Sequence, residues 1–274
     1  SKLDNVLYDV RGPVVEEAKR MEDAGMHVLK LNIGNPAPFG FRTPEEVIFD
    51  MRQQLTECEG YSDSKGLFSA RKAIMQYAQL KGLPNVSMDG IYTGNGVSEL
   101  INLSMSALLD TGDEVLVPSP DYPLWTACVN LAGGTAVHYL CDEQSEWYPD
   151  IDDMRKKITD RTKAIVIINP NNPTGTYEPI GELKAFADTL PEDVLLVMDE
   201  AYMEFATEPD CCSMVDYMKA HLEKPILVLR TFSKYYAMAG LRVGYALGSE
   251  ELIGIMRKCS ASWNLNVCAQ KAAE

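Results

Sequence analysis

Apolar residues recur at helical spacing in three segments of the first half of the chain. Val47, Ile48, Met51 and Leu55 share one face of a predicted helix. We expect Thr43 to cap that helix, with Pro44 in its first turn and Glu46 completing a capping box. Two further helices are predicted, one around the apolar positions 67, 70, 74 and 77 and one from Ser98 to Leu109.

Short apolar runs bounded by turn residues alternate with these helices and predict buried strands. The runs are Glu114–Val117, Ala164–Ile168, Val194–Met198, Ile226–Leu229 and Val243–Leu247. Alternating helices and short apolar strands are typical of an α/β fold, in which helices cover both faces of a mostly parallel sheet. Ligands of such folds bind beyond the carboxyl ends of the strands. The polar residues that follow these runs are therefore the first candidates for a site.

Residues 1–42 differ from the rest of the chain, and we expect them to form an arm and part of a smaller domain. The segment Tyr8–Pro13 precedes a predicted short helix, and Leu31–Pro36 is predicted to be a strand that ends in a turn. Residues 43–262 are expected to form the large domain.

Composition narrows the protein class. The net charge of -15 argues against general nucleic-acid binding, which requires a basic face. The seven cysteines are scattered without zinc-like spacing, which favours reduced thiols and a cytoplasmic protein. The chain begins without the features of a signal peptide, and no apolar run reaches the length of a membrane span. No metal site is expected, and the three histidines share no motif.

A lysine, an acid and an arginine form the chemical core of the sequence. Lys234 follows Thr231, Phe232 and Ser233, and Arg242 lies eight positions later. A lone lysine after a strand is usually a surface residue. Ser233 and Arg242, however, could bind a phosphate beside it, since arginine gives phosphate a two-pronged hydrogen bond. A lysine in a cationic or desolvated site loses its proton readily and can attack a carbonyl carbon.

Asp199, Tyr202 and Asn172 complete a site suited to pyridoxal phosphate, a cofactor that withdraws electrons from its substrate. Asp199 ends an apolar run and could face the protonated pyridine nitrogen. Tyr202 and Asn172 could both donate to the phenolic oxygen. Taken alone, the acid could cap a helix, and the Asn171–Gly175 segment is a good turn signal.

The segment Tyr92–Glu99 leads into the third predicted helix and could bind phosphate through its free N–H groups, with Val97 and Ser98 as candidates. A dinucleotide-binding motif requires glycine where Glu99 stands, and no P-loop lysine follows. Tyr122 could stack on a flat ring, although a tyrosine is more often a packing residue. Tyr61 is ambiguous by itself.

In this ordered set of motifs the chain resembles the fold-type I aminotransferases of the aspartate aminotransferase superfamily, class I/II. The resemblance covers almost all of the sequence. It implies a PLP-dependent transferase large domain plus an incomplete small domain, and it implies that Lys234 forms the Schiff base and moves the proton at the substrate Cα. Asp199 would pair with the pyridine nitrogen, Asn172 and Tyr202 would hold the phenolic oxygen, and Tyr122 would stack on the ring.

The same resemblance implies the remaining contacts. Val97, Ser98, Ser233 and Arg242 would bind the cofactor phosphate. Tyr61 would reach the phosphate of a neighbouring subunit, which implies a homodimer. Gly34 and Asn266 lie in segments that match the substrate side of the family site. Tyr8 and Arg11 are weaker candidates for the substrate. Residues 263–274 would begin the interdomain helix, with the rest of the small domain absent, including its carboxylate-binding arginine.

The resemblance has two parts, which suggests a chimeric chain. Residues from Tyr8 to about Gly175 resemble the alanine aminotransferase-like group, through LNIGNPAPFGF at 31–41 and GNGVSELI at 94–101. From about Thr176 the chain resembles histidinol-phosphate aminotransferase, through MDEAYMEF at 198–205 and VLRTFSKYYAMAGLRVGY at 228–245. The junction would lie near Asn169–Gly175.

The function predicted is therefore ping-pong transamination between an amino acid, or a histidinol phosphate-like amine, and a 2-oxo acid. The alternatives are another fold-type I enzyme, such as a β-lyase, decarboxylase or racemase, or a truncated or chimeric PLP-binding chain without full activity.

Overall fold

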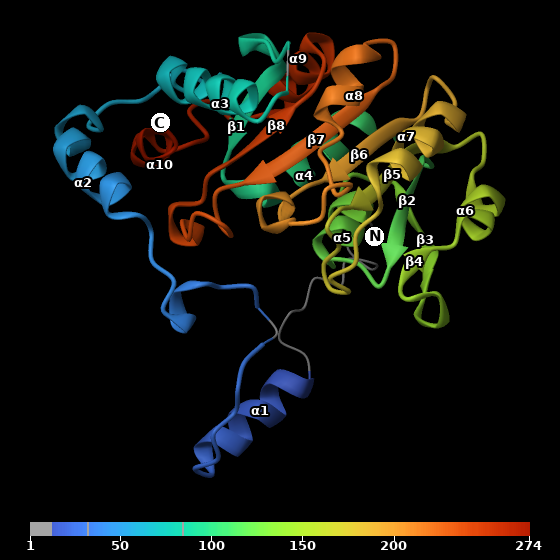
Figure 1. Cartoon of the computed structure of the whole chain (residues 1–274), viewed down its shortest axis with the longest axis horizontal. Helices are drawn as coiled ribbons and strands as arrows, with labels where there is room; N and C mark the ends of the chain where they lie inside the picture. The colour runs from blue at the N-terminus through green and yellow to red at the C-terminus, as the bar shows by residue number, and fades with distance from the viewer. Residues whose placement is uncertain (1–12, 32, 84) are drawn as a thin grey trace.

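An eight-stranded sheet forms the centre of the molecule (Figure 1). The computed structural model describes residues 13–31, 33–83 and 85–274. The strands lie in the order β1-β8-β7-β6-β5-β2-β3-β4. Their bounds are β1 (Ile91–Gly94), β2 (Glu114–Ser119), β3 (Thr135–Asp142), β4 (Tyr148–Pro149), β5 (Thr162–Ile168), β6 (Leu195–Asp199), β7 (Ile226–Thr231) and β8 (Gly244–Leu247).

The sheet is mostly parallel, as the sequence predicts. Strands β3, β2, β5, β6 and β7 pair in parallel, whereas β8 runs antiparallel to both β7 and β1. Strand β1 therefore points the same way as β7. The five apolar runs predicted as strands of the sheet are all present, while β1, β3 and the short β4 were not predicted. In β3, several residues are partly exposed, so its sequence lacks the continuous apolar run of the central strands.

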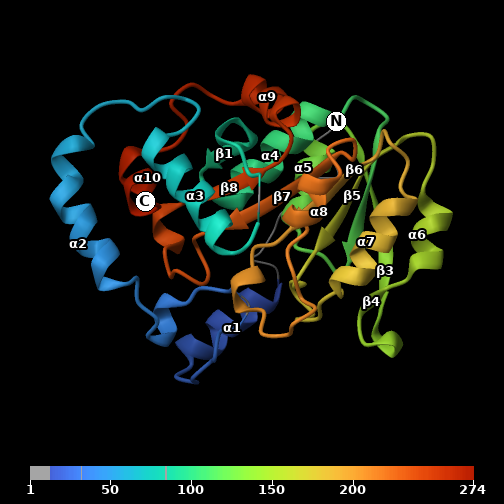
Figure 2. The same ribbon diagram turned by 45° about the horizontal axis from the view of Figure 1, so that its top comes forward.

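Helices cover both faces of the sheet (Figures 1 and 2). Along β5, Ile165 and Ile167 pack into one core, and Ala164 and Val166 pack into the other. This alternation follows from the two-residue period of a strand. The first core includes α3 (Phe68–Leu80), α6 (Ile151–Lys157), α7 (Ile180–Thr189) and α8 (Val215–Ala220); the second includes α4 (Gly96–Leu108), α5 (Leu124–Leu131) and α9 (Glu250–Cys259).

The segment before residue 43 stands apart from the sheet. Helix α1 (Pro13–Asp23) has no buried residue and projects from the body of the molecule (Figure 1). The predicted helix is thus confirmed. The predicted strand at Leu31–Pro36 is wrong, because residues 33–36 bend back on themselves and the Asn35 N–H donates to the carbonyl of Ile33 at 2.8 Å. Tyr8 and Arg11 lie outside the described residues.

A third apolar cluster joins α2 (Glu45–Gln54) to α10 (Val267–Ala272). Its centre is formed by Val243, Leu265 and Ala269, against which Val47 and Met51 pack. The predicted capping box of α2 is wrong. The N-cap is Pro44, and the Thr43 hydroxyl donates instead to the carbonyl of Ala237 at 3.1 Å.

Within the described part of the chain, no helix combines the length and apolar character needed to cross a membrane.

Candidate active site

The predicted site residues converge at one edge of the sheet because four parallel strands end there. Asn95 follows β1, Asn169 follows β5, Asp199 ends β6, and the segment with Lys234 follows β7. The antiparallel β8 begins at this edge, so Arg242, two residues before it, also lies there. Topology thus gathers side chains that are far apart in the sequence.

Lys234 is partly buried and has no carboxylate bound to its amine among the described residues. Its Nζ donates to the carbonyl of Gly34 at 2.7 Å and lies 5.5 Å from the ring centre of Tyr202. Burial lowers the pKa of Lys234, the charge of Arg242 lowers it further, and Asp199 opposes both. The amine is therefore easier to deprotonate than an exposed lysine, as a nucleophile requires.

Asp199 is 3% exposed at the end of β6. Its carboxylate accepts hydrogen bonds from Nε1 of Trp125 at 3.0 Å and from the Ala201 N–H at 3.2 Å. Burial raises the pKa of Asp199 to about 6, although these two hydrogen bonds and the charge of Lys234 act in the opposite direction. The group is therefore a buried anion at neutral pH, suited to a cationic ligand atom.

The start of α4 offers groups that could bind an anion. Asn95 provides no side-chain cap, so the N–H groups of the first turn, which includes Val97 and Ser98, stay open to a ligand. Arg242 adds a full positive charge beside them: its Nη2 lies 3.5 Å from the carbonyl of Asn95. Gly96 has a φ of +71°, and a Cβ there would stand 2.8 Å from that same Nη2. Only glycine allows the arginine to approach this closely.

Ser233 is buried just after the end of β7. Its N–H donates to Oγ1 of Thr231 at 3.1 Å, and its Oγ accepts from the same hydroxyl at 2.9 Å. The neighbouring residue Lys234 is thereby held at a defined position relative to the end of β7.

Gly34 lies against the lysine although 200 positions separate the two residues. A Cβ on Gly34 would stand 2.9 Å from the hydroxyl of Tyr202 and 3.0 Å from Nζ of Lys234. Burial raises the pKa of Tyr202, and the charge of Asp199 adds to the effect, so its hydroxyl stays a hydrogen-bond donor at neutral pH. Tyr202 and Gly34 therefore belong to the same cluster as Lys234.

Asn172 and Tyr122 lie at the same edge of the sheet. Asn172 lies in a tight loop that two backbone hydrogen bonds close. The Asn171 N–H donates to the carbonyl of Thr176 at 2.8 Å, and the Gly175 N–H donates to the carbonyl of Asn171 at 3.0 Å. The carbonyl of Tyr122 accepts from the N–H of Trp125 at 3.0 Å, which joins it to the residue that binds Asp199.

Two predicted residues have other partners in this structure. Tyr61 is 84% exposed and stacks on Trp263, with ring centres 4.9 Å apart. Asn266 caps α10, because its Oδ1 accepts from the Ala269 N–H at 2.7 Å. Neither has a described contact with Lys234.

The structure also reveals supporting residues that the sequence did not single out. Trp125 looks like an ordinary core residue in the sequence. Arg230, on β7, is buried and forms two ion pairs. Its Nη2 lies 2.7 Å from a carboxylate oxygen of Glu200, and its Nη1 lies 2.7 Å from a carboxylate oxygen of Glu204, so the segment after β6 is bound to β7. Glu99 accepts from the Asn95 N–H at 2.7 Å and from Nδ2 of Asn264 at 3.1 Å. The contact between Glu99 and Asn264 joins residues 165 positions apart, which no local pattern connects.

Comparison with known proteins gives consistent matches. Residues 26–274 match the family described as aminotransferase class I and II. The chain is 48% identical over 293 residues to the glutamate-pyruvate aminotransferase AlaA of Escherichia coli strain K12, and the match covers all of this chain and 69% of that protein.

Two further matches are more distant. The solved structure of an alanine aminotransferase from Pyrococcus furiosus has a TM-score of 0.91 at 36% identity, covering all of this chain and 71% of that one. Histidinol-phosphate aminotransferase 2 of Carboxydothermus hydrogenoformans is 33% identical over 272 residues, which cover 99% of this chain and 71% of that protein.

Proposed function

The chain belongs to the aminotransferase class I and II family, and from that premise we propose which of its residues perform the reaction. Homology to alanine aminotransferases makes it an enzyme that uses pyridoxal phosphate to move an amino group between an amino acid and a 2-oxo acid. One observation carries the assignment. The amine of Lys234 is partly buried beside Gly34 and Tyr202, and the charges of Arg242 and Asp199 both act on its pKa.

The residues at the sheet edge fit this cofactor. A phosphate suits the open N–H groups of α4 together with Arg242, Ser98 and Ser233. A protonated ring nitrogen suits the buried anion of Asp199, and an aldehyde suits the amine of Lys234. Because residue 96 is glycine, the guanidinium of Arg242 lies close to the backbone at the start of α4, in space that a Cβ would take up.

When bound, pyridoxal phosphate withdraws electrons from the substrate Cα. Asp199 keeps a proton on the ring nitrogen, because its ionised form is favoured above its pKa of about 6. Tyr202 and Asn172 would donate hydrogen bonds to the phenolic oxygen, and Tyr122 would stack on the ring.

Nζ of Lys234 removes the proton from the substrate Cα, and for this step the amine must be unprotonated. Burial lowers the pKa of Lys234 and so favours the unprotonated amine. Gly34 accepts a hydrogen bond from this amine at 2.7 Å and leaves room for the substrate beside it. Asn266 is proposed as a second substrate contact.

L-Glutamate and pyruvate are the proposed substrate pair, since the relative from E. coli is named for them. A homodimer is also proposed. The exposed Tyr61 and the exposed apolar residues Leu29, Leu31 and Phe49 support it, because side chains of this kind are commonly buried between subunits. The seven free thiols support a cytoplasmic location. The mosaic origin, with a junction near Asn169–Gly175, stays a prediction; separate comparison of the two halves with known proteins would test it.

Borohydride reduction of the purified protein tests the assignment. Peptide mapping is expected to place a reduced pyridoxyl group on Lys234. The variant Lys234→Ala is expected to lose the label, and the control Lys258→Ala, at an exposed lysine of α9, is expected to keep it. In single turnovers with L-glutamate, the pyridoxamine form should accumulate. Release of ammonia or carbon dioxide would instead indicate a lyase or a decarboxylase, and label on another lysine would refute the role of Lys234.

A further inference from the structure

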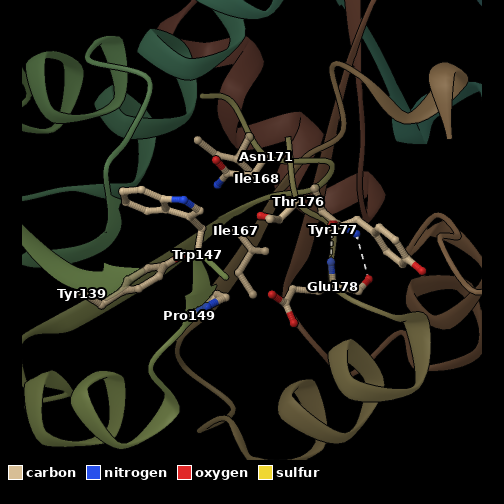
Figure 3. A pocket seen from close by; sticks show the side chains of 10 residues that line it. Tyr139, Trp147, Pro149, Ile167, Ile168, Asn171, Thr176, Tyr177 and Glu178 are labelled. Atoms are coloured by element: carbon tan, nitrogen blue, oxygen red, sulfur yellow. Dashed lines mark hydrogen bonds between the residues drawn. The ribbon is translucent and has the colours of Figure 1, made fainter. Parts of the chain in front are cut away.

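The hollow between β3, the turn before β4 and the segment after β5 leaves little room for a ligand (Figure 3). Four of the residues that line it, Tyr139, Ile167, Ile168 and Asn169, are at most 5% exposed. At the start of α4, by contrast, backbone N–H groups are left without a side-chain cap. The cause lies in how the residue before the helix is held.

Asn95 stands in the N-cap position of α4, yet its side chain makes no capping hydrogen bond. Asparagine is among the preferred N-cap residues, because its side-chain oxygen accepts from an N–H two or three positions later. Those positions are Val97 and Ser98, the residues proposed to bind the cofactor phosphate. The side-chain amide of Asn95 and a phosphate would thus compete for the same donors.

Two contacts turn the Asn95 amide away from these donors. Its Nδ2 donates to the carbonyl of Asn264 at 2.6 Å and to Oε2 of Glu99 at 3.2 Å. The Asn95 N–H donates to the same carboxylate oxygen at 2.7 Å. Glu99 thus binds back to the N-cap residue as the acid of a capping box does, although from one position further along, while the reciprocal bond from Asn95 is missing.

Glu99 itself is fixed from two sides. Nδ2 of Asn264 donates to its Oε2 at 3.1 Å and to the hydroxyl of Tyr92, on β1, at 3.2 Å. On the other side the carboxylate lies against Gly94, where a Cβ would stand 3.0 Å from Oε2. Because Asn264 lies two residues before Asn266, this network also joins the start of α4 to the segment that enters α10.

We propose that Glu99 and Asn264 are positioning residues, which keep the start of α4 free for the cofactor phosphate by holding the side chain of Asn95 away from it. The inference rests on the proposed cofactor site, to which it adds the residues that keep the N–H donors unoccupied. Loss of Glu99 removes the group that binds both the backbone and the side chain of Asn95, and the freed amide can then cap α4.

The sign of the effect separates positioning from charge. Glu99 carries a negative charge in the first turn of α4, near the proposed place of a phosphate dianion. If charge alone acted, Glu99→Ala would tighten phosphate binding, because like charges repel. If the carboxylate acts by holding Asn95, the same substitution weakens phosphate binding, because the freed amide occupies the donors.

Pyridoxine 5′-phosphate and pyridoxine are suitable probes, because they differ only in the phosphate and carry no aldehyde to react with Lys234. We would titrate each into the chain freed of cofactor, at constant ionic strength, and take the ratio of the two dissociation constants as the preference for phosphate. In Glu99→Ala this preference is expected to fall about fivefold, which is the strength of a typical asparagine N-cap. A general loss of structure would weaken both ligands together.

Removal of the competing amide provides a rescue. In the double variant Asn95→Ala with Glu99→Ala, no side chain remains to cap α4, so the preference for phosphate should rise again toward the wild-type value. Asn264→Ala removes one donor to Glu99 and leaves the carboxylate, so it should have a smaller effect in the same direction. Glu251→Ala removes an exposed acid from the first turn of α9 and serves as the control, with an unchanged preference.

An unchanged or larger preference in Glu99→Ala, or no recovery in the double variant, would overturn the inference. If borohydride still places the pyridoxyl label on Lys234, the proposed function stands and only the role of Glu99 is wrong. Equal affinity of the wild type for the two probes would refute phosphate binding at α4, and this inference with it. Melting curves show which variants are folded; should Glu99→Ala not fold, an unchanged preference in Asn264→Ala would overturn the inference as well.

Discussion

Replacing Trp125 with phenylalanine should raise the pKa of Asp199 and weaken the anion on which the proposed cofactor contact depends. Trp125 is fully buried, and its Nε1 donates to Oδ2 of Asp199 at 3.0 Å. Phenylalanine keeps an aromatic ring at this position and removes the N–H donor. The buried carboxylate would then retain the hydrogen bond from the Ala201 N–H.

The size of the effect follows from the strength of this bond. A hydrogen bond to a charged group contributes about 1.5–3 kcal/mol, and about 1.4 kcal/mol corresponds to one pKa unit. The pKa of Asp199, which burial places at about 6, should therefore rise by about one to two units, taking those bond energies at face value. At pH 7 the carboxyl group of Asp199 would change from mainly ionised to about half protonated for the smaller rise, or to mainly protonated for the larger one.

Carbon-13 NMR of the apoprotein labelled at the aspartate carboxyl carbon would measure this pKa directly. The Asp199→Asn variant identifies the signal by its loss. Trp263→Phe is a matched control, because Trp263 is 57% exposed and stacks on Tyr61, away from Asp199. Cofactor affinity at pH 7 should fall in Trp125→Phe, and the pKa of Asp199 should stay unchanged in the control. An unchanged or lower titration midpoint in Trp125→Phe would refute the reasoning.

Three further outcomes are expected. Arg230→Met leaves two buried carboxylates without their cationic partner and should cost about 3–5 kcal/mol in urea unfolding. Arg155→Met breaks an exposed pair with Asp152 and should cost about 0–1 kcal/mol, and equal losses would contradict the argument. Burial raises the pKa of Asp199 from 3.8 to about 6, so the native state binds its proton more tightly than the unfolded state. The apoprotein should therefore lose up to about 3 kcal/mol as pH rises from about 4 to 6, and Asp199→Asn should lack this loss in a pH series of melting curves. Gly34→Ala places a methyl group 3.0 Å from Nζ of Lys234 and should lower the transamination rate. Gly60→Ala adds a methyl group in open space and should leave the rate unchanged. Equal rates for the two variants would exclude close contact at Gly34.

The central strands and the place of the site could be predicted from the sequence, because both depend on local pattern. A run such as Ala164–Ile168 is apolar at every position. A strand needs such a run when helices cover both of its faces, because successive side chains then point into two apolar cores. The polar residues that follow such runs must then meet at one edge of a parallel sheet. For this reason Asp199 and Lys234 were expected together before any contact was known.

Two predictions made from local pattern were wrong, the capping box of α2 and the strand at residues 31–36. The Thr43–Glu46 segment satisfies a capping box, yet the structure uses the Thr43 hydroxyl to bind Ala237, 194 positions away. Leu31 and Ile33 stand at alternate positions, yet no strand of the described part of the chain pairs with residues 33–36. A strand needs a neighbour to satisfy its backbone groups, and the sequence of one segment does not show whether a neighbour exists.

Only the tertiary structure decided the contacts that tune the site. The hydrogen bond from Trp125 to Asp199 spans 74 positions, and that from Lys234 to Gly34 spans 200. Sequence alone thus determined the residue types, the central strands and the edge of the sheet at which the candidate site lies. The lowered pKa of Lys234 and the raised pKa of Asp199 required the folded chain, because burial and distance act between residues that only the fold brings together.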